Sequence, residues 1–414
     1  MKNAFILFKG GVETQEYFAL ELAKTFEQDG YEIFFYDLMD ELRSFDGLTS
    51  FVKQQRTAGN RILMFTFNFN GLAGESYLYE VTGAGVTSFW QEHEIPCFNM
   101  VVDHPIYYHK YEEFLPQCYH QISIDRNHAA YVKRYLPEIA AADSIWTPDG
   151  FLPLGGTRLD TGGDALPIGQ RPMKVSFTGN YTKPETFERY IAHLSREYRD
   201  FYHSILEEMI AHPEQELIEL AERRLRAELE TDGSILSDAD LKSCYGNMIF
   251  IDLWVRFAYR GAVIRELVDH GIQVDLFGAG WEALECKHPE NMLLHGGKTS
   301  KQCLEALAQS RISVNVMPWF KDGAHDRIFN SMLNGAVVCS DDSIYLKEIL
   351  QDSEHLRYYS LNRLEEVPDM VQNLLSNPAH MQQLADRAAA EAQEKHTWKE
   401  RAHTLEKMFD AILK

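Results

Sequence analysis

Short apolar runs alternate with helical patterns along the first part of the chain. Residues 3–8 form an apolar run typical of a buried strand, and Phe18, Leu22 and Phe26 follow at four-residue spacing, which predicts a helix over residues 14–29. Gly30 ends this helix, because a residue without Cβ suits a left-handed cap. The other elements predicted in this half are strands at residues 31–38, 61–67, 97–102 and 121–124 and a helix at residues 48–57. Strands that alternate with helices predict a parallel, doubly wound sheet.

A second series of strands and helices begins near residue 173. Its predicted strands are residues 173–178, 273–277, 312–317, 336–340 and 356–360, and a helix is predicted at residues 253–270. Residues 184–245 are rich in Glu, Leu, Arg and Ala and nearly lack Gly, which predicts a helical insertion after the first of these strands. From residue 365 the pattern is almost entirely helical, with breaks near residues 378 and 396.

The two series are joined by a segment of different composition. Residues 148–172 contain four Pro and six Gly, which is typical of a linker. The expected fold is therefore α/β, with two Rossmann-like, doubly wound domains facing a cleft, a helical insertion and a C-terminal helical tail. We expect an N-terminal domain at residues 1–165, a second domain at residues 166–395, and a last helix at residues 396–414 that packs back on the N-terminal domain.

The charge balance excludes several classes of partner. The chain has 40 Lys and Arg against 62 Asp and Glu, a formal net charge of −22, which disfavours nucleic-acid polymers and anionic membrane surfaces. No apolar run reaches the roughly 18 residues that span a bilayer, and the N-terminal run is too short for a signal peptide. The six Cys are scattered without a CxxC motif, which fits a reducing cytoplasm. We expect a cytoplasmic protein without an integral membrane segment.

Glycine turns follow two of the predicted strands. Gly10 and Gly11 follow the first strand, and Gly278 and Gly280 follow the strand at residues 273–277. Such turns let backbone N–H groups approach a phosphate or a sugar, although a tight strand-to-helix turn explains them equally well. The acidic residue that dinucleotide-binding domains place about 20 positions further on is missing, so a dinucleotide oxidoreductase is disfavoured.

The densest cluster of chemically useful side chains lies between residues 314 and 342. After a strand, a loop carries Lys321, Asp322, His325, Asp326 and Arg327 in front of a predicted helix. Arginine binds phosphate through two parallel hydrogen bonds, and the N-terminus of a helix adds favourable potential. The alternative is a solvated loop in which Asp326 caps the helix and Arg327 forms a surface ion pair.

The residues around this loop resemble a known family. The order PWF at residues 318–320, DG at 322–323, HDR at 325–327 and NGA at 334–336 is similar to the C-terminal domain of CgeB-like (spore-maturation-type) bacterial glycosyltransferases, which have the GT-B architecture. VSFTGN at residues 175–180, the arginines and glycines between residues 256 and 281, and HTW at residues 396–398 also resemble this family. The resemblance covers residues 173–414 and is looser in the N-terminal half.

The resemblance implies sugar transfer from a nucleotide-diphosphate sugar, bound by the second domain, to an acceptor bound by the N-terminal domain. The residues expected at the nucleotide sugar are Gly10, Gly11, Gly278, Gly280, Trp281, Gly297, Lys298, Pro318, Trp319, Asp322, Gly323, Ala324, His325, Asp326, Arg327 and Asn330. His325 and Arg327 are expected beside the reacting bond. Related retaining enzymes carry two glutamates eight positions apart, where this chain has Asp322 and Asn330. The stereochemistry therefore stays open.

Catalysis is expected to proceed without a metal or other cofactor, because the sequence has no clear Asp-x-Asp site. An inverting reaction needs a general base, for which Asp103 and His104 at the end of a predicted strand are the candidates. A polar strand end held by Pro105 is the alternative. Tyr107, Tyr108, Trp146 and Phe151 could stack on sugars, although packing is the commoner role.

Three functions are compatible with this pattern. The first is a glycosyltransferase that acts on a glycan or on a protein such as flagellin or a surface-layer protein. The second is a nucleotide-sugar epimerase or hydrolase on the same fold. The third is a non-catalytic binding or assembly protein, which the substitution at Asn330 and the helical insertion would suit.

Overall fold

The computed structural model describes residues 3–83, 85–137, 139, 150–160, 166–230 and 233–412. The chain forms two compact units. The first consists of Met1–Leu154 with Trp398–Lys414, and the second consists of Gly155–Thr397. Trp146 and part of the expected linker, residues 148, 149 and 161–165, lie outside the described residues.

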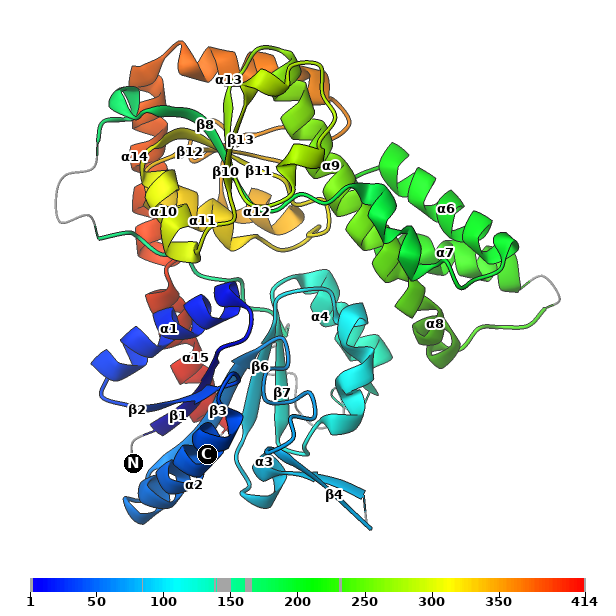
Figure 1. The fold of residues 1–414 in the computed structure, drawn as a ribbon, viewed down its shortest axis with the longest axis vertical. Coiled ribbons are helices and arrows are strands. Elements are labelled where there is room, and N and C mark those ends of the chain that lie inside the picture. Colours follow the sequence, from blue (N-terminus) through cyan, green and yellow to red (C-terminus); the bar gives the residue numbers. More distant parts are fainter. Residues whose placement is uncertain are drawn as a thin grey trace. The chain divides into compact units, whose positions relative to one another are not determined.

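The first unit is built on a five-stranded parallel sheet with the order β2-β1-β3-β6-β7 (Figure 1). Its strands are β1 (Asn3–Lys9), β2 (Glu32–Asp37), β3 (Arg61–Phe67), β6 (Cys97–Val101) and β7 (Tyr119–Ser123). Its main helices are α1 (Glu13–Gln28), α2 (Glu41–Thr57), α3 (Phe89–Glu92), α4 (Arg126–Tyr135) and α15 (Trp398–Ile412), and a 3-10 segment covers Pro105–Phe114. Ile6 in β1, an inner strand, pairs with Phe34 on one side and Met64 on the other.

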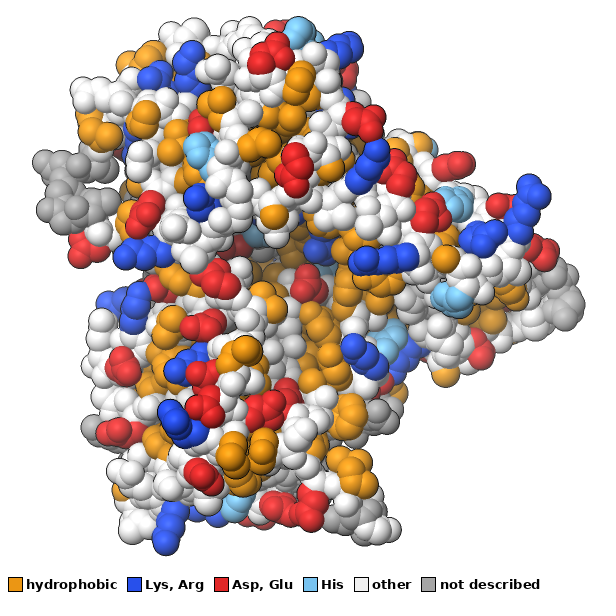
Figure 2. Space-filling view, viewed as in Figure 1, with side chains coloured by type: hydrophobic (Ala, Val, Ile, Leu, Met, Phe, Trp, Pro, Cys, Tyr) orange, Lys and Arg blue, Asp and Glu red, His pale blue; other side chains and the backbone are white. Residues whose placement is uncertain are grey.

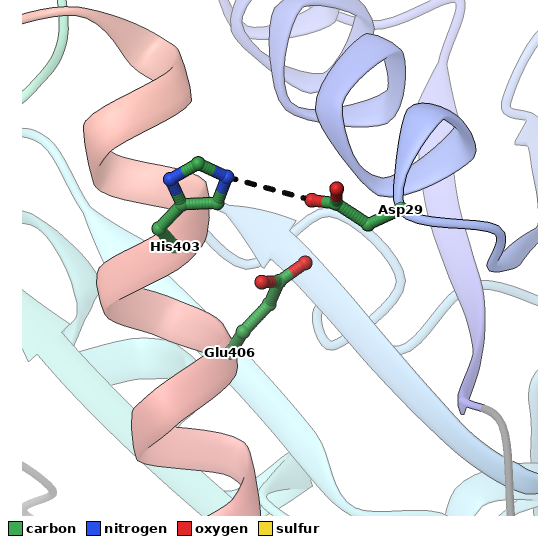
Figure 3. Close-up of side chains that lie close together, drawn as sticks. All are labelled: Asp29, His403 and Glu406. Carbon is green, nitrogen blue, oxygen red and sulfur yellow. Dashed lines mark ion pairs between the residues drawn. The ribbon is translucent and has the colours of Figure 1, made fainter.

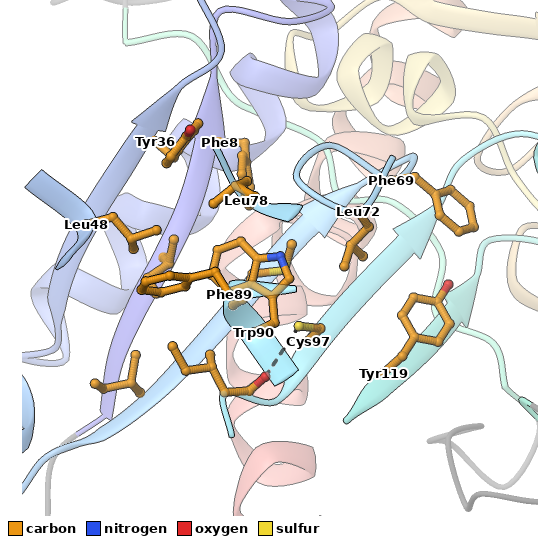
Figure 4. Close-up of a cluster of buried hydrophobic side chains, with 14 of the residues drawn as sticks. Phe8, Tyr36, Leu48, Phe69, Leu72, Leu78, Phe89, Trp90, Cys97 and Tyr119 are labelled. Carbon is orange, nitrogen blue, oxygen red and sulfur yellow. Dashed lines mark hydrogen bonds between the residues drawn. The ribbon is translucent and has the colours of Figure 1, made fainter. Parts of the chain in front are cut away.

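Buried apolar side chains explain these elements. Six of the seven residues of β1 are buried, so both faces of this inner strand are covered. One face packs in a cluster around Trp90, whose indole N–H donates to the Gly71 carbonyl at 2.7 Å (Figure 4). On α15, the Phe409 ring lies 5.4 Å from that of Phe5, and the Trp398 ring lies 4.9 Å from that of Phe18 in α1. The C-terminal helix is therefore part of the first unit's core.

The second unit contains a six-stranded parallel sheet with the order β10-β9-β8-β11-β12-β13. Its strands are β8 (Met173–Thr178), β9 (Val274–Phe277), β10 (Met292–Gly296), β11 (Ser310–Asn315), β12 (Val337–Ser340) and β13 (Arg357–Tyr358). The helices between and after them are α9 (Ile249–Asp269), α10 (Ser300–Ala308), α11 (Asp326–Leu333), α12 (Ile344–Ile349), α13 (Val367–Leu375) and α14 (Pro378–Lys395). This is the strand order of a doubly wound sheet that reverses direction between β8 and β11.

The insertion after β8 is helical, as the sequence predicts. It contains a 3-10 segment at Pro184–Tyr190 and the helices α6 (Arg196–Ala211), α7 (Leu217–Leu229) and α8 (Asp238–Tyr245). These helices lie beyond α9, away from the β8–β13 sheet (Figure 1). The Tyr259 hydroxyl on α9 donates to the Ile210 carbonyl at 2.5 Å, so the insertion is joined to a helix of the sheet domain.

The structure confirms the predicted α/β fold and differs from the sequence predictions in detail. The helix predicted at residues 48–57 begins earlier, at Glu41, and a hairpin of β4 (Tyr79–Thr82) and β5 (Gly85–Ser88) was not predicted. The sequence pattern does not predict this hairpin, because Val81 and Val86 are exposed. Its strands therefore lack the alternation of apolar residues that marks a strand packed on a core. The units divide at residues 154/155 and 397/398, against expected boundaries at 165/166 and 395/396.

No helix of the described residues is long and apolar enough to cross a membrane. On the face drawn in Figure 2, acidic and basic side chains are interspersed, and no large basic patch is visible.

Candidate active site

The candidate donor site lies at the carboxyl ends of β8 and β11, where the strand order of the second sheet reverses. Arg327, in the first turn of α11, is buried at this point. Its Nη1 donates to Asn315 Oδ1 at 3.0 Å at the end of β11, and its guanidinium lies 5.0 Å from the Phe177 ring of β8. A Cβ on Gly179 would lie 3.0 Å from Nη2. Arg327 therefore reaches the ends of both central strands.

Arg260, from α9, contributes a second buried guanidinium. Its Nη1 donates to the Asn180 carbonyl at 2.5 Å, in the turn after β8. Its side chain packs between the rings of Phe257 and Trp319, with 4.9 and 5.5 Å from the guanidinium carbon to the ring centres. The Nε atom is buried and has no hydrogen-bond partner among the described residues. Arg260 thus keeps an unused donor at the strand ends.

The protein offsets only part of the positive charge at this site, because the nearby carboxylate of Asp326 acts on Arg327. Neither Arg260 nor Arg327 forms an ion pair with a carboxylate among the residues that the structure describes. Burial, together with the charges of Arg327 and Arg256, lowers the pKa of Arg260 well below its usual value, and burial also lowers the pKa of Arg327. By contrast, Arg256 is paired with Asp252 at 3.0 Å. Two like charges buried together are costly unless an anion joins them, so the arrangement favours binding of an anion.

His325 and Asp326 shape the N-terminus of α11. The Arg327 amide donates to His325 Nδ1 at 3.2 Å, and Asp326 Oδ1 lies 2.8 Å from the same nitrogen. Burial and the charge of Arg327 lower the pKa of His325. His325 is therefore neutral near pH 7.

Asn330 holds another part of the second unit in place. Its Oδ1 accepts from the Thr157 amide at 2.8 Å, and its Nδ2 donates to Asp326 Oδ2 at 2.9 Å. One turn later, Asn334 Oδ1 accepts from the Leu159 amide at 2.9 Å. Asn330 and Asn334 therefore secure the segment after residue 155 to α11.

The glycines after β8 and β9 allow two turns to pack against each other. A Cβ on Gly278 would lie 2.2 Å from the Gly179 carbonyl oxygen, and a Cβ on Gly280 would lie 2.1 Å from that of Tyr181. Trp281 is fully buried, and its indole N–H donates to Gly179 at 2.9 Å. Close backbone packing therefore explains these three predicted residues, which support the turn that carries Asn180.

The remaining residues predicted to bind the nucleotide sugar differ in their exposure to solvent. Gly297 and Lys298 are exposed after the edge strand β10, two strands from β8. In the loop before α11, Pro318, Gly323 and Ala324 are buried, whereas Trp319 and Asp322 are partly exposed. The structure thus brings Trp319, His325, Asp326 and Arg327 together with Arg260, and it places Lys298 at the edge of the sheet.

A pocket of about 250 Å³ adjoins this loop. Lys321, Asp341 and Tyr359 line it, and the Tyr359 hydroxyl donates to the Asn315 carbonyl at 2.6 Å. Lys321 Nζ donates to the carbonyl of Pro213, which belongs to the turn between α6 and α7. Burial raises the pKa of Asp341 to about 7. The helical insertion therefore forms one wall of a pocket beside the residues that hold Arg327.

In the first unit, the predicted residues lie at the carboxyl ends of β1 and β6. Gly10 has a φ of +79°, and its amide donates to Glu16 Oε2 at 2.8 Å. A Cβ on Gly10 would lie 2.5 Å from Asp37 Oδ1, and one on Gly11 would lie 3.5 Å from the Asn70 amide. Both glycines therefore fit a tight turn close to the ends of β2 and β3.

Asp103 is held by two donors after β6. Asn68 Nδ2 and the Tyr108 hydroxyl donate to Asp103 Oδ2 at 3.0 and 3.1 Å, and Asn68 Oδ1 accepts from the Val102 amide at 2.8 Å. Asn68 and Phe69 have left-handed φ values of +47° and +67°. Phe69 is buried and stacks on Tyr108 at 5.0 Å. Strained backbone that is fixed by its surroundings is common at functional sites, and here it orients a carboxylate.

His104 is buried and caps a helix. Its Nδ1 accepts from the Ile106 amide at 3.1 Å, at the start of the 3-10 segment, and its ring packs against His128 and Tyr131 at 4.5 and 5.1 Å. Of the two candidate bases, Asp103 is the more accessible. The geometry therefore favours Asp103 over His104 for contact with an acceptor.

Comparisons with known proteins identify the fold. Residues 260–407 match the model of a family described as glycosyl transferase-like. The structure of Anabaena Alr3699/HepE in complex with UDP-glucose aligns over 98% of this chain and 100% of its own, with 9% identity and a TM-score of 0.50. That of an alpha-glucosyltransferase (AGT) in complex with UDP aligns over 100% of both chains, with 11% identity and a TM-score of 0.50. This chain has the GT-B fold of glycosyltransferases.

Two further comparisons are limited. The alignment with TarM covers 37% of this chain and 31% of TarM, with 15% identity and a TM-score of 0.30. No curated protein matches the chain. The glycosyl transferase-like region begins at Arg260, and it includes Arg327 and the loop before α11.

Arg260 was missed as a site residue by sequence reasoning. A signal for it exists, because Arg260 shares a helix face with Ile264 and Leu267, both of which are fully buried. An arginine on the apolar face of a helix is expensive to bury unless it serves a ligand or a partner. Asn68 was missed because nothing in the sequence shows that it turns back onto Asp103.

Proposed function

We propose that this protein is a glycosyltransferase that transfers a sugar from a nucleoside-diphosphate sugar, with the donor bound by the second unit. The observation that carries this proposal is the pair of buried guanidinium groups, Arg260 and Arg327, without carboxylate partners among the described residues. Their position at the reversal point of a doubly wound sheet is where such sheets bind nucleotides. A diphosphate would supply the missing negative charge.

The same residues suit the chemistry of the transfer. Negative charge grows on the leaving diphosphate as its bond to the sugar breaks, and preorganised cations stabilise that charge. Arg260, Arg327 and the N-terminus of α11 would supply this stabilisation without a metal ion. His325 could form a hydrogen bond with a sugar hydroxyl through Nε2.

The first unit would bind the acceptor. We propose that Asp103, oriented by Asn68 and Tyr108, takes the proton of the acceptor hydroxyl. The acceptor oxygen then attacks the anomeric carbon, the bond to the phosphate oxygen breaks, and the nucleoside diphosphate leaves with inversion. A retaining reaction remains the alternative, in which Asp103 would have no role as a base.

We further infer a CgeB-like enzyme that transfers a hexose or a related sugar in the cytoplasm. Its acceptor would be a glycan intermediate or a protein such as flagellin or a surface-layer protein. The resemblance of residues 318–342 to that family supports this assignment. UDP is the first nucleotide to test, because both aligned structures with a TM-score of 0.50 hold UDP or UDP-glucose.

Thermal unfolding with a panel of nucleoside diphosphates and their sugars tests the proposal. We expect UDP or another member to raise Tm of the wild type and of Arg265→Ala, but not of Arg260→Met. Arg265 is the matched control, since it lies on the same helix and contacts the Glu285 carbonyl. If no nucleotide raises Tm, the donor site is wrong. Conversion of the donor without an acceptor, seen by mass spectrometry, would instead indicate an epimerase or a hydrolase.

A further inference from the structure

Two carboxylates and an imidazole converge where α15 passes the end of α1. Asp29 follows α1, and His403 and Glu406 project from α15 toward it (Figure 3). The Nε2 atom of His403 lies 3.5 Å from Asp29 Oδ2, and one ligand atom from each of the three residues falls within 4.8 Å of the others. All three residues belong to the first unit, so the cluster is defined by the packing of its own core.

Glu406 contributes a shielded acceptor without a donor. Its Oε1 atom is buried and has no hydrogen-bond partner among the described residues. The nearby cation Arg61 already pairs with Asp410 at 2.6 Å. Two carboxylates, those of Asp29 and Glu406, therefore face one imidazole at this point.

The ligand types fit a transition metal better than Ca²⁺ or Mg²⁺. One imidazole nitrogen with two carboxylate oxygens is a common ligand set for Zn²⁺, whereas the alkaline-earth ions prefer oxygen alone. Ligand atoms in a tetrahedral zinc site lie about 3.3–3.5 Å apart, because each bond is about 2.0–2.2 Å long. The 3.5 Å between His403 and Asp29 meets this value. Only Glu406 would have to move closer.

A further carboxylate lies near the second nitrogen of His403. Nδ1 lies 4.0 Å from Glu400 Oε1, on the preceding turn of α15. A carboxylate behind the imidazole orients the ring and strengthens it as a ligand. We propose that Asp29, His403 and Glu406 bind a divalent transition-metal ion, such as Zn²⁺, that joins α15 to α1.

This site is independent of the proposed sugar transfer. Its role would be to fasten the C-terminal helix, which is distant in sequence, to the first helix of the same unit. A ligand that binds only the folded state stabilises it by mass action. We therefore expect metal to act on the stability of the first unit rather than on the donor residues.

Zinc titration of the full chain, after treatment with EDTA, tests the proposal. We expect calorimetry to show about one bound Zn²⁺ per chain and Tm to rise by roughly 2–4 °C with saturating zinc. His403→Ala and Glu406→Gln should each weaken binding by about 10-fold or more. The control is His288→Ala, which removes another exposed histidine that pairs with a glutamate, Glu290, at 3.0 Å. It should bind zinc like the wild type.

Glu406→Gln separates metal binding from ordinary packing. This change keeps the side-chain shape and removes the repulsion between Glu406 and Asp29. Without metal at pH 8, its Tm should equal or exceed that of the wild type, while its response to zinc is lost. Absence of zinc binding by the wild type at 100 µM would overturn the proposal. Zinc binding that survives in both variants at wild-type strength would overturn it equally.

Discussion

Both sheets are parallel, but the side chains at their carboxyl edges have opposite chemistry. At the β8 and β11 ends, Arg260 and Arg327 are buried without carboxylate partners among the described residues. At the β3 and β6 ends, Asp103 accepts hydrogen bonds from Asn68 and Tyr108. One edge is prepared for an anion and the other presents an oriented carboxylate. The two sheets thus differ in strand order and in the chemistry of these edges, although both belong to α/β domains.

Arg327→Ala should have the largest effect. We expect donor turnover to fall by about 10²–10³-fold, because a preorganised charge at the leaving group is lost. Release of nucleoside diphosphate in a coupled assay measures this, and circular dichroism checks the fold. Arg327→Lys keeps the charge but not the paired donors, and it should recover only part of the activity. Normal turnover by folded Arg327→Ala would remove the contrast between the two edges.

Gly280→Ala should mainly affect stability at the cationic edge. Gly280 and Gly271 have similar φ values of +87° and +80°, but only a Cβ on Gly280 would meet the Tyr181 carbonyl. We expect Gly271→Ala to cost about 1 kcal/mol and Gly280→Ala about 3 kcal/mol in the free energy of unfolding. Urea denaturation compares them. Equal losses would show that conformation alone, and not close packing of the turns, requires glycine at residue 280.

The acceptor edge is tested by Asp103→Asn and Asn68→Gly. Loss of the base should lower kcat by about 100-fold. Loss of the positioning amide should lower kcat by about 10-fold with little change in KM for the donor, since glycine keeps the left-handed backbone. Asn60→Ala is the control. Asn60 follows α2, and its side-chain amide donates a hydrogen bond to Gln55 of that helix rather than to Asp103. Unchanged kcat in Asp103→Asn with saturating acceptor would favour a retaining reaction.

The smallest expected effect is on the pH dependence of stability, through Asp341. Burial raises its pKa in the folded protein to about 7, above the value of 3.8 for an unperturbed aspartate. The folded state therefore binds this proton more tightly, and the stabilisation is complete below about pH 4 and is lost as pH rises through 7. We expect wild-type stability, relative to Asp341→Asn, to fall as the pH rises from about 4 to about 7. Denaturation at several pH values measures the difference, and parallel curves would contradict the prediction.

Local sequence was enough to predict most of the scaffold. Strands such as β1 and β12 are continuous apolar runs that must be buried, and amphipathic spacing predicts helices such as α1 and α9. The HDR residues 325–327, at the start of α11, could also be chosen as candidate site residues. The reason is that a connection from a strand to a helix lies at the carboxyl edge of a parallel sheet. These inferences depend only on neighbours in the chain.

The site itself depended on residues that are distant in sequence. The sequence alone determined the α/β fold, the helical insertion and Arg327 as a candidate for an anion. Only the tertiary structure placed Arg260 of α9 beside Arg327, turned Asn68 onto Asp103, and used Asn330 to hold the backbone of Thr157. It also brought His403 to Asp29. The physical reason is that tertiary packing decides which side chains are buried and which charges are paired. The pattern of one segment does not show which other segments it packs against.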